Sequence, residues 1–239
     1  AEFEAEGSRM DELMRLKDVA SNIQIPIILK IGGVEAVTDV YNGLCLGVKG
    51  VIAPMAETAF AVSKFTALVG DLVAEDNRKE IEFAINIETI TAYNNLDEIL
   101  AIKDLSNIQG VTVGRVDFTS SMGGDRSFAD SEEMLEMCTD IFSKSRDKGL
   151  KCGLGGAVSS DSIDFIKSLS EKKLIDKYET RKVVFAADSI FEKPKEGLLK
   201  AIEFELLWLR SKQRYYSSIK SEDENRIKML DSRLQKASI

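Results

Sequence analysis

Phe83-Ala84-Ile85-Asn86-Ile87-Glu88 has the pattern of a short β-strand that ends on an acid. Its large apolar residues alternate with small or polar ones, so one face of the strand is apolar and the other finishes on the carboxylate of Glu88. A second run, Val111-Thr112-Val113-Gly114-Arg115-Val116-Asp117, also ends on an acid. Two such carboxylates brought together would suit a hard cation.

Similar strand-like runs recur on both sides of these two, and most are followed by an amphipathic segment of helical length. This alternation is typical of βα units around a parallel sheet. We expect strands over residues 2–6, 25–31, 50–55, 81–88, 110–117, 151–158 and 182–188. We expect helices over residues 9–21, 34–46, 59–74, 96–103, 131–148 and 162–173, with Asp130 and Ser131 offering N-cap oxygens to one of them.

The expected strands are one fewer than the eight of a closed barrel, whose usual size is about 250 residues. We therefore predict an α/β fold, a TIM-type (β/α)8 barrel over residues 1–190 that lacks or truncates its first βα unit. Residues 191–239 are predicted to form a helical extension, interrupted near residues 217–221. This extension carries two apolar stripes, which favour packing on another subunit in a homo-oligomer over a solvated end with one buried face: Leu198, Ile202, Leu206 and Leu209, then Ile227, Leu230 and Leu234.

Composition limits the function classes. The net charge of −8 argues against binding to nucleic acid or to an anionic membrane surface. No apolar run approaches the roughly 20 residues needed to cross a bilayer. The cysteines Cys45, Cys138 and Cys152 lack metal-ligand spacing and are expected to be reduced thiols. We predict a cytoplasmic protein that acts on small molecules.

The chain contains no histidine. This excludes Ser-His-Asp and Cys-His catalysis, histidine-ligated zinc and an imidazole base. Any proton transfer must use Asp, Glu, Lys, Tyr, Cys or water.

Several charged residues are expected at the carboxyl ends of parallel strands, where barrel enzymes place their active sites. Glu88 and Asp117 are the candidate metal ligands; the alternative is that both acids cap the helices that follow. Glu6, Lys30 and Asp188 are expected at or near the same edge.

Longer motifs around these acids point to a family. Asn86-Ile87-Glu88-Thr89, Asn95-Leu96-Asp97-Glu98-Ile99 and Gly110-Val111-Thr112-Val113-Gly114-Arg115-Val116-Asp117-Phe118-Thr119-Ser120-Ser121-Met122-Gly123 resemble the pyruvate class II aldolases and citrate lyase β-subunit-like enzymes. Ala53-Pro54-Met55-Ala56-Glu57-Thr58 looks like the preceding strand end of that family. The resemblance extends over residues 2–158.

The resemblance implies a lyase that cleaves or forms a carbon-carbon bond in a 2-oxo acid or acyl-thioester substrate through a metal-stabilised enolate. It implies that Glu88 and Asp117 hold Mg²⁺ or Mn²⁺. It also implies that backbone N–H groups near Val116 and Asp117 receive the substrate carboxylate, and that Asn86 is a polar neighbour of the site.

Two positions depart from the family pattern. Lys30 lies near the place of an arginine, and Gly7 stands where the family has a histidine base. Glu6 or a metal-bound water could replace that base. Two alternatives remain open: a Schiff-base aldolase that uses Lys30 as its nucleophile, and a non-catalytic ligand-binding or assembly barrel.

Overall fold

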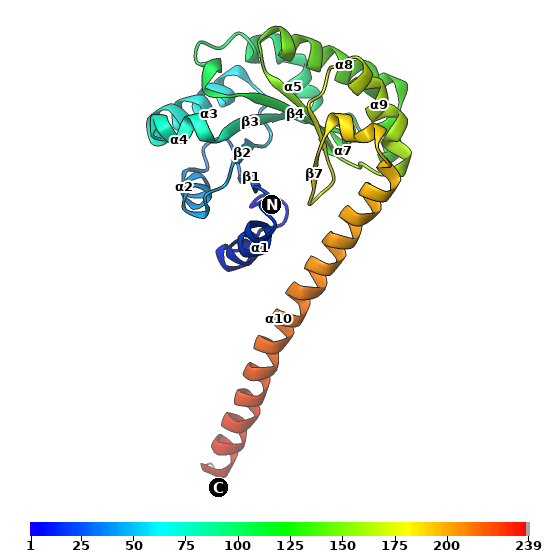
Figure 1. Cartoon of the computed structure of the whole chain (residues 1–239). Coiled ribbons are helices and arrows are strands. Elements are labelled where there is room, and N and C mark those ends of the chain that lie inside the picture. Colours follow the sequence, from blue (N-terminus) through cyan, green and yellow to red (C-terminus); the bar gives the residue numbers. More distant parts are fainter. Residues whose placement is uncertain (238–239) are drawn as a thin grey trace. The chain divides into compact units, whose positions relative to one another are not determined.

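The computed structural model describes residues 1–237 as two compact units, one of residues 1–198 and one from Leu199 onward (Figure 1). A sheet with its strands in chain order forms the first unit. Strands β1 to β6 are parallel, and β7 pairs antiparallel with β6. The strands are β1 Ile28–Lys30, β2 Gly50–Ala53, β3 Glu82–Ile87, β4 Gly110–Gly114, β5 Lys151–Gly155, β6 Lys177–Glu179 and β7 Val184–Ala186.

Helices connect the strands and pack against them, as expected for βα units. Figure 1 shows α2, α3 and α4 grouped beside the early strands and α8 and α9 beside the later ones. The helices of this unit are α1 Met10–Asn22, α2 Val37–Leu46, α3 Ala59–Leu72, α4 Glu75–Glu80, α5 Ile90–Asn94, α6 Leu96–Ile99, α7 Arg115–Ser121, α8 Glu132–Asp147 and α9 Ile163–Glu171. Short 3₁₀ turns are η1 Leu105–Asn107, η2 Arg126–Asp130, η3 Ser160–Ser162 and η4 Ala187–Phe191. The predicted α/β class is confirmed.

Strand alternation divides the sheet into two faces. The apolar face is fully buried and includes Leu29, Val51, Phe83, Ile85, Ile87, Val113 and Leu154. The opposite face, which we call the polar face, combines charged residues with small ones: Lys30, Ala84, Asn86, Gly110, Thr112, Gly153, Gly155 and Glu179. Small residues on this face leave space for long side chains from neighbouring strands.

Side-chain caps start several helices where the sequence offers a hydroxyl. Thr58 Oγ1 accepts a hydrogen bond from the Ala61 amide at the start of α3, at 3.1 Å. Ser131 Oγ accepts one from the Met134 amide at the start of α8, also at 3.1 Å, so the predicted Ser131 cap is confirmed.

The N-terminal strand predicted over residues 2–6 is wrong. Only Glu2 forms a bridge, parallel to Lys30, and the chain then turns through Gly7, whose φ of 53° lies in the left-handed region. The sheet still has seven strands, because β6, which was not among the predicted strands, takes the place of the missing one in the count. The strand predicted over residues 182–188 is shorter than expected, and it runs antiparallel in a hairpin with β6.

Most other predicted elements occur but are shorter than predicted, such as the strand over residues 25–31, observed as Ile28–Lys30. The strand predicted over residues 110–117 ends at Gly114, and Arg115 begins α7, so Asp117 lies in the first turn of a helix and not on a strand. The helix predicted over residues 96–103 ends at Ile99.

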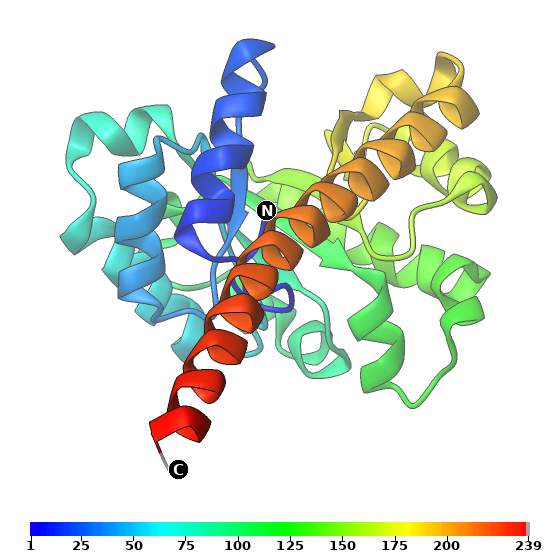
Figure 2. The ribbon, with the colours of Figure 1, turned by 90° about the horizontal axis from the view of Figure 1, so that it is seen from below.

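The second unit is formed by α10, a single helix of Pro194–Ala237 that also provides the last residues of the first unit. Figure 2 shows α10 as one uninterrupted rod. The break predicted near residues 217–221 is therefore wrong. Ser221 Oγ donates to the Ser217 carbonyl at 2.9 Å, so this hydroxyl is satisfied within the helix and does not interrupt it.

The cysteines and the helices can be compared with what the composition predicted. The three cysteines are free thiols, with Cys45 exposed and the other two buried. Within residues 1–237, no helix combines the length and apolar character needed to cross a membrane.

Candidate active site at the strand ends

Glu88 follows β3 directly, and its side chain is almost completely buried on the polar face. Its Oε1 accepts a hydrogen bond from the Met55 amide at 2.9 Å, and its Oε2 accepts one from Asn86 Nδ2 at 3.0 Å. Met55 has a φ of 51°, an uncommon backbone conformation that lets its amide donate to this carboxylate. Burial raises the pKa of Glu88, and the nearby Asp117 carboxylate raises it further, although Lys30 offsets part of the effect.

Glycine makes room for the Glu88 carboxylate. A Cβ added at Gly114, at the end of β4, would lie 2.5 Å from Glu88 Oε2 and 3.0 Å from Glu88 Cβ. Any larger residue at position 114 would therefore displace Glu88.

Lys30 ends β1 beside this carboxylate. Its Nζ lies 2.6 Å from Glu4 Oε2 and 3.7 Å from Glu88 Oε2. Burial works against the charged form, but the charges of Glu88 and Glu4 outweigh it and raise the pKa of Lys30. Lys30 is therefore a protonated ammonium at neutral pH. The Glu4 contact was not predicted.

Asp117 and Val116 lie in the first turn of α7, immediately after β4. Asp117 is exposed, and in the part of the chain that the structure describes its carboxylate makes no hydrogen bond or ion pair. It is close enough to Glu88 for its charge to act on that residue. The chain thus brings the two predicted metal ligands to the same edge of the sheet, from β3 and from the helix after β4.

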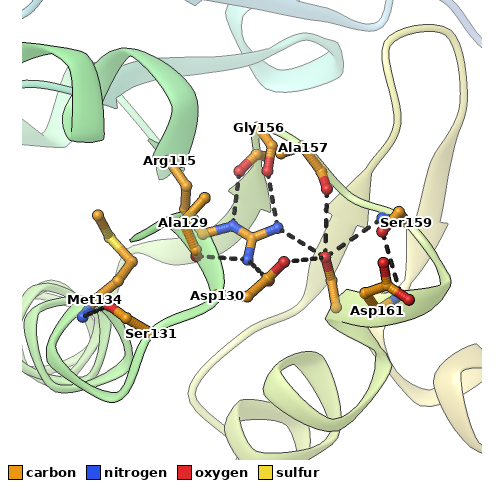
Figure 3. A network of polar contacts seen from close by, with 11 residues as sticks. Arg115, Ala129, Asp130, Ser131, Met134, Gly156, Ala157, Ser159 and Asp161 are labelled. Carbon is orange, nitrogen blue, oxygen red and sulfur yellow. Dashed lines mark hydrogen bonds and ion pairs between the residues drawn. The ribbon is translucent and has the colours of Figure 1, made fainter. Parts of the chain in front are cut away.

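A buried arginine holds the start of α7 in place (Figure 3). The Arg115 side chain is fully buried, and its nitrogens donate to the carbonyls of Gly155 at 3.2 Å, Gly156 at 2.8 Å and Ala129 at 2.9 Å. It also forms an ion pair with Asp130, and its guanidinium lies 4.7 Å from the centroid of the Phe165 ring. Ser162 Oγ completes the network by donating to Asp130 at 3.1 Å. We call these residues the Arg115 cluster.

Gly156 packs against the amides of α7. Its φ is 78°, and a Cβ at this position would lie 2.6 Å from the Arg115 nitrogen and 2.7 Å from the Val116 nitrogen. The structure shows that Gly156 serves a close approach of one backbone segment to another.

Glu179 is a further acid at this edge that the sequence did not indicate. It ends β6, and its Oε1 would be 2.9 Å from a Cβ added at Gly155, the end of β5. Within residues 1–237 the Glu179 carboxylate has no hydrogen-bond or ion-pair partner. Burial raises its pKa, Glu88 adds to the rise, and Lys177 and Lys30 offset part of it.

The predicted base Glu6 lies in a different ionic group. Its carboxylate binds Arg181 Nε at 3.2 Å and also Lys182, and a neighbouring ion pair joins Glu2 to Arg181 at 3.0 Å. Burial favours the neutral acid, but Lys182 and Arg181 outweigh it and lower the pKa of Glu6. These pairs join the N-terminal segment to the β6–β7 turn, so the geometry favours a structural role for Glu6.

The fit of a divalent cation can be judged from the donors present. No group of three or more His, Cys, Asp or Glu side chains with metal-binding geometry occurs within residues 1–237. Mg²⁺, however, is commonly held by one or two carboxylates, with substrate and water completing its shell. In the described part of the chain, the buried Asn86 Oδ1 has no partner, nor does Oγ1 of Thr112, its neighbour in register on β4. The Glu88 carboxylate beside these free oxygen atoms, with Asp117 at the end of the neighbouring strand, fits a hard cation and a polar ligand.

Comparison with known proteins places this site in context. Residues 27–165 match the family model described as HpcH/HpaI aldolase/citrate lyase. None of the curated protein sequences compared with the chain matches it significantly.

Solved structures share the fold at low sequence identity. The HpcH/HpaI aldolase from Desulfitobacterium hafniense DCB-2 superposes with a TM-score of 0.60 at 16% identity, over 74% of this chain and 73% of that one. Citrate synthase SbnG gives 0.63 at 14% identity, over 86% and 83%. Macrophomate synthase gives 0.53 at 20% identity, over 69% and 64%. These likenesses confirm the predicted TIM-type fold, and because the family model matches more than half of the sequence, the chain belongs to the HpcH/HpaI aldolase/citrate lyase family.

Proposed function

We propose that the protein is a divalent-metal-dependent carbon-carbon lyase that acts on a 2-oxo acid or a related acyl thioester. The observation that carries the proposal is the placement of Glu88 and Asp117 after two neighbouring parallel strands, β3 and β4, with Asn86 Oδ1 beside Glu88 buried and unpartnered among residues 1–237. Membership of an aldolase/citrate lyase family supports the same class of reaction.

Glu88 and Asp117 would hold the cation, Mg²⁺ or Mn²⁺. When bound, the cation would act as a Lewis acid for negative charge that develops on the substrate oxygen. Glu88 is fixed for this task by the Met55 amide and by Asn86, whereas Asp117 is exposed and forms no hydrogen bond or ion pair with any described residue.

Lys30 would balance the charge of this edge and attract the anionic substrate. Its raised pKa keeps it protonated, which suits an electrostatic role and works against a Schiff-base nucleophile, since that reaction needs the neutral amine. The backbone N–H groups near Val116 and Asp117 are proposed to receive the substrate carboxylate. The Arg115 cluster supports this role by fixing the first turn of α7.

Glu179 is the side chain best suited to carry a proton in this chain without histidine. Its pKa is raised, and among residues 1–237 no partner competes for its carboxylate. It lies on the polar face, where the charges of Glu88 and Lys30 act on it. A raised pKa makes a carboxylate a stronger base, which suits a group that accepts a proton and returns it. Glu6 is less suited because its cationic partners make it a weaker base.

A non-catalytic ligand-binding barrel is the second candidate. It is favoured by Gly7 in place of the family's histidine and by the ionic partners of Glu6. A non-catalytic barrel of this kind would bind a 2-oxo acid but would not exchange the acid's protons with solvent.

Manganese titration followed by electron paramagnetic resonance tests the metal site. We expect wild-type protein to bind Mn²⁺ and Glu88→Gln to bind it at least about tenfold more weakly, because the variant loses an anionic ligand. Glu82→Gln is the matched control, since it removes a carboxylate from the other end of β3, where Glu82 pairs with Lys177 and Lys151. Unchanged Mn²⁺ affinity in Glu88→Gln, or no binding by the wild type, would contradict the proposal.

A further inference from the structure

The second unit carries an apolar seam with the spacing of a coiled coil. Counting from Leu199, alternate steps of three and four residues reach position 234 along one continuous helix, and the seam is aliphatic at both ends but polar from Gln213 to Asp223. The seam consists of Leu199, Ile202, Leu206, Leu209, Gln213, Tyr216, Lys220, Asp223, Ile227, Leu230 and Leu234. Two aliphatic stretches in the same three-four register favour a helix that winds around another helix, with a polar segment between them.

The apolar members of this seam are exposed. The seven aliphatic side chains among them have between 41% and 68% of their surface accessible. An isolated helix of this length has little support from propensity alone and is normally stabilised by packing of its apolar face. A long apolar stripe in water is therefore a surface that needs a partner.

We infer that this seam pairs with the same seam of a second copy of the chain, as an antiparallel two-stranded coiled coil centred between Tyr216 and Lys220. This goes beyond the proposed reaction and does not depend on it.

The polar residues of the seam select the partner and the direction. Antiparallel helices place each a position opposite a d position of the partner. One register then joins Ile202 to Leu234, Leu206 to Leu230 and Leu209 to Ile227 at both ends of the pair. The same register places Gln213 opposite Asp223 and Tyr216 opposite Lys220 in the middle. Every apolar residue from 202 to 234 thus meets an apolar one, and every polar residue meets a polar one.

A parallel pair in register would also match apolar with apolar residues, but it would place Lys220 opposite Lys220 and Asp223 opposite Asp223. Its flanks would be favourable, with Glu205 beside Arg210 and Arg226 beside Asp231 of the second copy. Exposed pairs of this kind contribute little, whereas like charges at the seam are partly desolvated and repel. Lys220 also contacts Glu224 of its own helix at 3.6 Å, which leaves Asp223 as the main charge against the parallel arrangement.

The native mass of the full chain, followed by light scattering or sedimentation over a concentration series, tests the pairing. We expect the double variant Leu206→Glu/Leu230→Glu to halve the mass of the wild-type assembly while the circular dichroism of the first unit is retained. Leu207→Glu is the control: Leu207 is exposed to a similar degree but lies outside the seam, so this variant should keep the wild-type mass. A monomeric wild type, or an assembly that the double variant leaves intact, would overturn the inference.

Disulfide trapping then tests the direction. In a Cys45→Ser background, which removes the exposed native thiol, the double variant Leu206→Cys/Leu230→Cys should form a covalent dimer under mild oxidation, and neither single variant should. A covalent dimer of Leu206→Cys alone would show the parallel arrangement and overturn the antiparallel register. Failure of all three variants to crosslink would overturn the pairing itself.

Discussion

The Arg115 cluster and the carboxylates of the polar face lie next to each other at the strand ends, yet they differ in how far their buried polar groups are hydrogen-bonded. Around Arg115, carbonyls, Asp130 and Ser162 satisfy the buried guanidinium (Figure 3). On the polar face, Asn86 Oδ1 and Thr112 Oγ1 are buried without partners among residues 1–237, and the Glu179 carboxylate lacks one there too.

This difference separates the scaffold from the site. A fully paired buried ion with several hydrogen bonds fixes the segments that it joins. A buried polar atom without a partner costs about 1–3 kcal/mol unless water or a ligand satisfies it. The first group therefore holds α7 and the loops after β5 in place, and the second leaves donors and acceptors for a ligand.

The largest expected effect comes from breaking the paired region. Arg115→Met should lower the free energy of unfolding by about 3–5 kcal/mol, because Asp130 and several carbonyls lose their buried partner. Denaturant unfolding measures this change. Arg126→Met, at an exposed position in η2, should change stability by less than about 0.5 kcal/mol. If both variants unfolded at the wild-type midpoint, the structural role of the Arg115 cluster would be refuted.

A smaller effect is expected from crowding the unpaired region. Gly114→Ala places a Cβ against Glu88 and should cost about 1–3 kcal/mol of stability, with a loss of Mn²⁺ affinity of at least about tenfold. Gly33→Ala provides the control, because a Cβ at Gly33 meets nothing within 4 Å. Wild-type Mn²⁺ binding by Gly114→Ala would show that the position of Glu88 does not matter for the metal.

The smallest effect concerns Glu179 and should appear as a pH dependence of stability. Because the pKa of Glu179 is raised in the folded protein, the folded state holds this proton more tightly than the unfolded state does. The contribution of Glu179 to the free energy of unfolding is therefore full below the pKa that Glu179 has in the unfolded state. It is lost as the pH rises through the higher pKa of the folded state. Glu179→Gln should remove that loss and be the more stable protein at alkaline pH, as measured by thermal unfolding from pH 4 to 9. A stability difference that did not change with pH would contradict the environment assigned to Glu179.

The sequence predicted the parts of this molecule that follow a regular period. Glu88 was placed correctly because strand alternation fixes the face on which it lies. Asp117 was assigned to a strand because Val116 extends the strand-like pattern past Gly114, and this pattern alone does not reveal that a helix begins at Arg115.

Glu179 and Arg115 were missed for different physical reasons. The β6 strand that carries Glu179 has only three residues, too few for a periodic signal. The one related feature of the sequence is Gly155 on the neighbouring strand, which leaves space for the Glu179 side chain. Arginine is rarely fully buried, so nothing in the pattern around Arg115 indicates the cluster that forms there.

Solvent deuterium incorporation into the methyl group of pyruvate tests the central claim most directly, since it detects the enolate without any knowledge of the second substrate. With Mg²⁺ present, we predict exchange by the wild type and by Glu82→Gln, and loss of exchange in Glu88→Gln and in Glu179→Gln. Exchange that is no faster than in buffer with Mg²⁺, or that is unchanged in Glu88→Gln, would contradict the account, and binding of pyruvate without exchange would favour the non-catalytic barrel.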